Sequence, residues 1–119
     1  MLRLLVIAAT VVNVMFGLAV GSTRGAIFSQ LGLPPPVPFY GDMLAVFLAG
    51  TGLAFIPAVG NPQPYRFYLW TVGAGVKLVV ASMFLRVWIL GLTPWSILLG
   101  VIVDGGIGAG LVYCLLRTR

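Results

Sequence analysis

The chain has 119 residues, of which 61% are apolar and only 8% are charged, far below the roughly 25% charged residues of soluble domains. This composition excludes a soluble fold and predicts one integral membrane domain over residues 1–119, because helices of about 20 residues leave little chain for loops. The formal net charge of +5 comes from single Lys and Arg residues near the ends of apolar segments. It therefore indicates topology and headgroup contact, and no nucleic-acid partner.

Breaks in the apolar pattern divide the chain into four expected helices, at about residues 4–20, 43–59, 67–90 and 95–116. A longer loop over 21–42 holds a proline cluster that cannot continue a helix, with a short turn at 25–31. The cluster consists of Pro34, Pro35, Pro36 and Pro38. The runs GNPQPYR and GLTP mark the two shorter connections. The expected fold is all-α: a four-transmembrane-helix bundle with up-down topology and short loops.

The first apolar segment has a second interpretation. Arg3 followed by an apolar run and then Ala19-Val20-Gly21 resembles a secretory signal with a small-residue cleavage site. The run is longer than the usual 7–15 residues of a signal core, and it contains Asn13. These features favour a retained first helix, while the cleaved alternative predicts mature protein beginning near Ser22.

The positive charges predict that both termini face the cytoplasm. In that orientation four arginines lie on the inner side and two on the outer side, which fits the positive-inside rule. The inner set is Arg3, Arg66, Arg117 and Arg119, and the outer set is Arg24 and Arg86 with Asp42 nearby. Aromatic residues near the span limits are interpreted as interfacial belts; they are Tyr65, Tyr68, Trp70 and Tyr113 on the inner side and Phe39, Tyr40, Trp88 and Trp95 on the outer side.

Depth arithmetic predicts a polar layer near the middle of the bilayer. With a rise of 1.5 Å per residue, Lys77 lies about 15 Å from Phe67 and Asp104 about 14 Å from Trp95. Either charge unpaired would cost about 2.5–3.5 kcal/mol, so the two are expected to pair. Asn13 and Thr51 fall at the same depth in the first two helices.

Small residues share a helix face with the two predicted charges. Gly100, Asp104 and Gly108 follow Ser96 at a spacing of four, Gly106 and Gly110 form a second row, and Gly73, Lys77 and Ala81 form another. Small residues allow close helix contact in lipid. The layer of Asn13, Thr51, Lys77 and Asp104 is therefore expected to face inward, either as a structural ion pair or as a binding or ion-responsive site. The outer group of Arg24, Asp42 and Arg86 is likewise either a loop clasp or a headgroup contact.

Chemistry that depends on metals or thiols has no support in the sequence. There is no His and a single Cys, Cys114, so the usual zinc and haem ligands and any intramolecular disulfide are missing. We expect no metal and no cofactor, and we interpret Cys114 as a small buried apolar residue.

A series of short motifs resembles the DoxX-like family of small four-helix bacterial membrane proteins. The motifs are LGLPPP, NPQPYR, GAGVKL with the mid-span lysine, GLTP, and IVDGG with the central aspartate, and they run from about Leu31 to the C-terminus. The first helix matches only in kind. The resemblance implies a multi-pass bundle in the inner (plasma) membrane of a bacterium. Named relatives have been linked to quinone-related electron transfer or oxidative-stress assemblies, but the resemblance carries over no catalytic residue.

Three function classes stay open. An accessory or structural component, with a protein partner or a homo-oligomer, fits the short loops and Gly-rich faces. A small oligomeric transporter would use Asp104 as its coupling carboxylate, although the glutamate that small multidrug exporters carry in their first helix has no counterpart here. An enzyme would use Lys77 as nucleophile or Asp104 as base, and no second catalytic group is positioned by sequence. The bilayer is the expected partner, and a quinone or lipid ligand stays open although no residue supports it.

Overall fold

A computed structural model describes residues 1–34 and 36–118, so Pro35 and Arg119 lie outside the described residues. The described chain is all-helical. Four helical segments are long and apolar enough to cross a membrane: Leu2–Ser22, Pro38–Gly60, Gln63–Ile89 and Ile97–Arg117. The expectation of four helices long and apolar enough to span a membrane is thereby confirmed.

The first segment is a single helix, α1 (Leu2–Ser22), followed by the short helix α2 (Ile27–Gln30). The chain turns between them at Arg24 and Gly25, which both have positive φ angles. A second turn follows α2 at Gly32, where φ is +75° and a Cβ would collide with the ring of Pro94. Only glycine fits there, because both the conformation and the contact exclude a side chain.

The second segment begins earlier than expected and is bent. Helix α3 (Pro38–Leu53) starts at Pro38 rather than near residue 43. A proline is well suited to the first helical position, where its missing N–H has no intrahelical acceptor and its φ is already helical. The bend separates α3 from α4 (Ile56–Gly60). Pro57 accounts for it, because it offers no N–H to the carbonyl of Leu53.

The third segment changes its winding along its length. A 3₁₀ turn η1 (Gln63–Tyr65) and α5 (Arg66–Tyr68) lead into η2 (Leu69–Val76), a stretch of π-helix, and then into α6 (Lys77–Ile89). The wide π turns end at Val76, and the ordinary α-helix begins at Lys77. The last segment is the single helix α7 (Ile97–Arg117).

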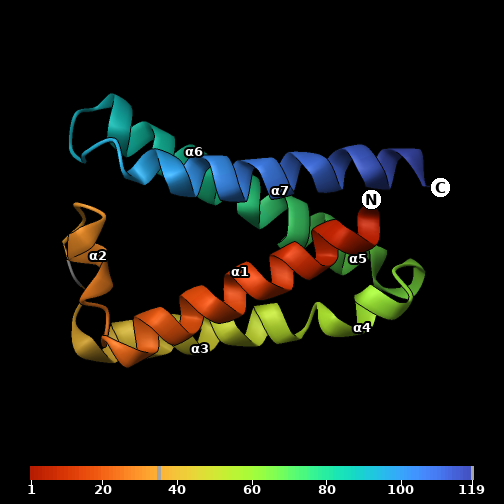
Figure 1. Cartoon of the computed structure of the whole chain (residues 1–119), viewed down its shortest axis with the longest axis horizontal. Helices are drawn as coiled ribbons and strands as arrows, with labels where there is room; N and C mark the ends of the chain where they lie inside the picture. Colours follow the sequence, from red (N-terminus) through yellow and green to blue (C-terminus); the bar gives the residue numbers. More distant parts are fainter. Residues whose placement is uncertain (35, 119) are drawn as a thin grey trace.

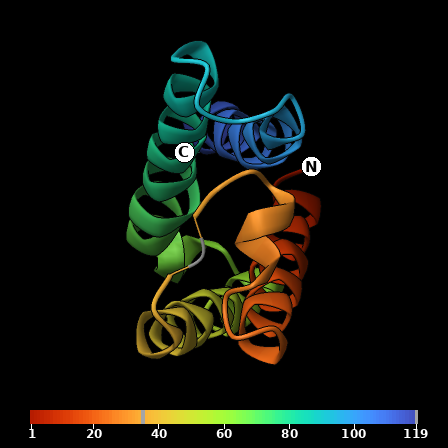
Figure 2. The ribbon, with the colours of Figure 1, turned by 90° about the vertical axis from the view of Figure 1, so that its left-hand side faces the viewer.

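The spans form two antiparallel hairpins, α1 with α3 and α6 with α7 (Figures 1 and 2). In the first hairpin, Arg3 donates to the carbonyl of Gly60 at one end, and Arg24 pairs with Asp42 at the other. The hairpins converge at the end where both termini lie and diverge at the other, where α2 lies between them.

Glycines set the closest helix contacts. A Cβ on Gly17 of α1 would lie 2.7 Å from the backbone N of Ala49 in α3. In the second hairpin, Gly100 and Gly108 of α7 face side chains of α6, as the first small-residue row suggested. The two glycines of the second row have different surroundings: a Cβ on Gly110 would meet Leu5 of α1, whereas a Cβ on Gly106 would meet no other helix within 4 Å.

The apolar core lies at the converging end. It joins both hairpins through side chains that are buried or nearly so: Val6, Ala9, Phe55, Ala58, Leu69, Ala74, Ile107, Leu111 and Leu115. The long dimension of the backbone is 41 Å, which matches a bilayer of about 40–45 Å with its headgroups.

Candidate functional site

Lys77 lies at the centre of a hydrogen-bonded network between the two hairpins. It is the first residue of α6 and is 4% exposed. Its Nζ lies 2.9 Å from Oδ1 of Asp104 on α7 and donates to Oδ1 of Asn13 on α1 at 2.8 Å. The predicted pairing of Lys77 with Asp104 is confirmed.

Asn13 extends the network to the second segment. Its Nδ2 donates to Oγ1 of Thr51 at 3.2 Å, and the Thr51 hydroxyl donates to the backbone carbonyl of Phe47, 2.8 Å away. Each of the four spans thus contributes one of the predicted polar residues. We call Asn13, Thr51, Lys77 and Asp104 the polar layer; their geometry is established here, and a binding role stays a prediction.

The two charges of the polar layer differ in their surroundings. The Lys77 side chain is 5% exposed, whereas that of Asp104 is 19% exposed. Among the hydrogen bonds of residues 1–34 and 36–118, one reaches the Asp104 carboxylate, and it ends on Oδ1. The second oxygen of Asp104 is therefore available to another donor.

A cavity of about 560 Å³ lies between the hairpins, and all four polar-layer residues line it. The rest of its wall is mostly apolar, with Phe16 from α1, Leu44 from α3 and Phe84 from α6. The apolar core of the converging end lies beyond the polar layer, so the layer forms the floor. Leu31, which follows α2, lines the opposite end.

Two supporting features escaped the sequence analysis. The first is the π-helix η2, which ends directly before Lys77; an ordinary helix over the same residues would point that side chain in another direction, because a π turn holds more residues. Gly73 lies in this stretch, and a Cβ there would be 3.0 Å from Leu111. No sequence signal marks a π turn, although π stretches are frequent at functional sites.

The second feature is Tyr68, which the sequence assigned to an interfacial belt. Its hydroxyl donates to the backbone carbonyl of Thr51 at 2.7 Å, and its ring lies 4.9 Å from that of Phe55. The carbonyl is free because the N–H of Phe55 bonds to Gly52 instead at the bend. Pro57 was the available signal, since a proline inside an apolar span predicts a bend and unpaired carbonyls before it.

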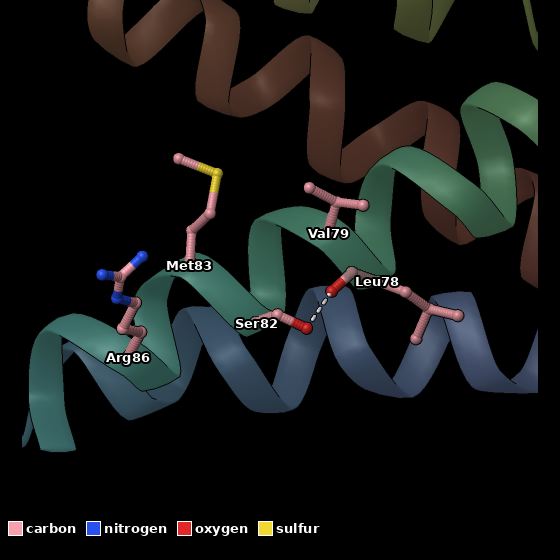
Figure 3. Close-up of a pocket in the computed structure, with 5 residues that line it drawn as sticks. All are labelled: Leu78, Val79, Ser82, Met83 and Arg86. Carbon is pink, nitrogen blue, oxygen red and sulfur yellow. Dashed lines mark hydrogen bonds between the residues drawn. The ribbon is translucent and has the colours of Figure 1, made fainter.

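The structure joins two of the three residues expected in the outer charge group. Arg24 and Asp42 form a salt bridge of 3.1 Å, with side chains 65% and 47% exposed. Arg86 lies in the last turn of α6, where it lines a shallow groove with Ser82 and Met83 (Figure 3). In the described part of the chain no salt bridge includes Arg86. The predicted trio is thus a pair and a separate arginine.

At the converging end, arginines hold the ends of helices. Arg66 donates to the carbonyls of Leu115 and Thr118, and Arg3 donates to Gly60. The last carbonyls of a helix lack intrahelical partners and carry partial negative charge, so arginine is favourable there. Arg117 lies over the ring of Tyr113. The fourth arginine assigned to this side, Arg119, lies outside the described residues.

Within residues 1–34 and 36–118 no group of three or more His, Cys, Asp or Glu side chains is placed to hold a metal, and Cys114 is buried without a disulfide partner. No family model matches the chain, and comparisons with curated proteins and with solved structures find no significant match.

Proposed function

We propose that this chain is an accessory or structural component of a larger membrane assembly, in the manner of the DoxX-like proteins that its motifs resemble. The observation that carries the proposal is the polar layer, which ties one hairpin to the other through the bond from Lys77 to Asn13. A buried charge pair with satisfied hydrogen bonds fixes helix register. A stable register is what a small subunit needs to present one surface to a partner.

The sequence and the network argue against a proton wire. The chain has only two acidic residues, Asp42 and Asp104. Asp42 is paired with Arg24 at the end where the hairpins diverge. From Lys77 the hydrogen bonds lead through Asn13 to Thr51 and end on a backbone carbonyl. A proton relay through a membrane uses a series of titratable groups, and this path offers none after Lys77.

The test is recovery of a partner from native membranes. A tagged chain carrying a photoreactive residue at Phe67, which is 80% exposed, is crosslinked in cells and purified. We expect one other protein in a reproducible ratio. The matched control carries the same photoreactive residue at Phe55, which is fully buried and should crosslink only within the chain. If photoreactive residues placed around the exposed faces recover only lipid, the proposal is wrong.

A second candidate is a small-molecule or ion transporter that works as an oligomer. It is favoured by one observation: Asp104 lines the cavity and keeps one carboxylate oxygen without a described partner. In this case Asp104→Asn abolishes coupled transport or a resistance phenotype in whole cells, while Asp42→Asn has little effect. An unchanged rate in Asp104→Asn removes the candidate.

We propose the inner membrane of a bacterium as the location, with both termini in the cytoplasm and the first helix retained. Arg3, Arg66 and Arg117 support this orientation because they lie at the end with the termini, whereas Arg24 and Arg86 lie at the other end. Retention is supported by Asn13, whose loss with α1 would leave Lys77 without one of its two acceptors.

Labelling from outside the cell tests the orientation. In a Cys114→Ala background, Ser22→Cys should react with a membrane-impermeant maleimide, and Thr118→Cys should react only after the cells are opened. Both positions are exposed at helix ends. The opposite pattern contradicts the orientation, and loss of the Ser22→Cys chain's first helix on mass analysis contradicts retention.

A further inference from the structure

The cavity between the hairpins is apolar along its walls and polar only at its floor. Leu44, Leu48, Val80 and Phe84 line the walls, and the polar layer lines the floor. Binding sites for small molecules typically have this composition, with a few placed polar groups that fix orientation. The volume of about 560 Å³ falls within the range of about 300–1,000 Å³ common for such sites.

The hydrogen-bond inventory of the floor defines what it can bind. A lysine ammonium has three N–H donors and an amide nitrogen has two; Lys77 uses two of its donors, and Asn13 uses one. Oδ2 of Asp104 adds an acceptor with no described donor. The floor therefore offers both donors and an acceptor, within reach of one another.

The charge of the floor selects against ionic ligands. The Lys77 and Asp104 charges cancel each other across 2.9 Å, so a bound ammonium or carboxylate would bring an uncompensated charge into an apolar site, which is costly. A hydroxyl group is neutral and both donates and accepts. It can donate to Asp104 Oδ2 and accept from Asn13 or Lys77.

Access is from the side of the molecule. Leu31 lines the end of the cavity next to α2, and lining residues on its sides are exposed: Phe47 on α3 and Val76 on η2 are 64% and 51% exposed, and Leu99 on α7 is 56% exposed. In a membrane these side chains face lipid, so a molecule already dissolved in the bilayer can reach the cavity from the sides of the molecule.

From these observations we infer that the cavity binds a neutral lipophilic alcohol, taken from the bilayer, with its hydroxyl on the polar layer and its hydrocarbon part toward α2. This site goes beyond the accessory role, which requires no ligand. Its ligand is defined by three properties: no formal charge, one hydroxyl, and a hydrocarbon body that fills the apolar walls.

The test is binding of a matched probe series to the full chain in lipid nanodiscs. All four probes have the same saturated long chain and carry a photoreactive diazirine. They are a primary alcohol, its methyl ether, and the corresponding amine and carboxylic acid. The alcohol should label residues on the walls, and the ether should bind about tenfold more weakly because it cannot donate to Asp104. Equal labelling by alcohol and ether, or stronger labelling by the amine or the acid, overturns the inference.

Two neighbouring substitutions locate the site. Val80→Trp places an indole in the cavity, which Val80 lines, and should reduce alcohol labelling at least tenfold. Val79→Trp is the control, because Val79 is 58% exposed and does not line this cavity; its labelling should be unchanged. Undiminished labelling of a folded Val80→Trp chain places the probe elsewhere and contradicts the inference. If Val80→Trp does not fold, the comparison of alcohol with ether on the unmodified chain still decides.

Discussion

The two ends of the molecule are built from the same kind of helix and differ in how the hairpins meet. At the end with the termini, Val6 of α1 and Leu111 of α7 are fully buried in one shared apolar core. At the other end the hairpins diverge around a cavity, and the short helix α2 lies between them. The polar layer lies at the boundary. Apolar packing, together with arginine hydrogen bonds to helix ends, holds the converging end together, while the open end depends on hydrogen bonds at its floor.

The largest expected effect comes from breaking the ion pair at that boundary. Lys77→Met or Asp104→Asn leaves the other partner buried alone, which typically costs about 3–5 kcal/mol. The double substitution should recover most of this loss, because no uncompensated charge remains. Unfolding of the purified chain in detergent measures all three variants. If the single variants are as stable as the parent, or if their losses simply add in the double variant, the interaction between Lys77 and Asp104 does not stabilise the fold.

The next effect concerns the crossing of α1 and α3. Gly17→Ala places a methyl group 2.7 Å from the backbone N of Ala49, so the helices must separate, and we expect a loss of about 1–3 kcal/mol. Gly50→Ala is the matched control on α3, because the added methyl group would meet no other part of the chain within 4 Å. Alanine is the better helix former, so this control should be neutral or slightly stabilising. A cost for Gly50→Ala equal to that for Gly17→Ala would show that the crossing is looser than described.

The polar layer was accessible from the sequence because depth in a membrane follows from counting. A rise of 1.5 Å per residue brings Asn13, Thr51, Lys77 and Asp104 to one level whatever the rotation of each helix. Because an unpaired charge in lipid is costly, Lys77 and Asp104 could then be expected to pair. These two arguments need no knowledge of how the helices pack.

Features that depend on packing were not accessible in the same way. The π turns of η2 and the open cavity arise from contacts between spans, such as Gly73 against Leu111, which no local pattern encodes. The early start of α3 at Pro38 was missed because a proline cluster was interpreted only as a loop. Arg86 was grouped with Asp42 because both were predicted to lie on the same side of the membrane, and a shared side alone does not bring two side chains together.

A smaller effect is expected where Tyr68 supports the bend of the second segment. Tyr68→Phe keeps the ring on Phe55 but leaves the carbonyl of Thr51 without its donor, so we expect a loss of about 0.5–1.5 kcal/mol. Unfolding in detergent measures it. Tyr113→Phe is the control, since Tyr113 is 57% exposed and should lose little. Equal losses in both variants would show that the bend does not depend on the Tyr68 hydroxyl.

The smallest effect should come from the second ion pair, at the open end. Arg24 and Asp42 lie 3.1 Å apart, almost the same separation as Lys77 and Asp104, but their side chains are about half exposed or more. Exposed pairs are worth about 0–1 kcal/mol because water and salt screen them. Asp42→Asn should therefore cost less than about 1 kcal/mol, and added salt should reduce even that difference. A loss of stability as large as that of Asp104→Asn would mean that the open end depends on its surface charges. It would also mean that burial does not decide how much each ion pair contributes to stability.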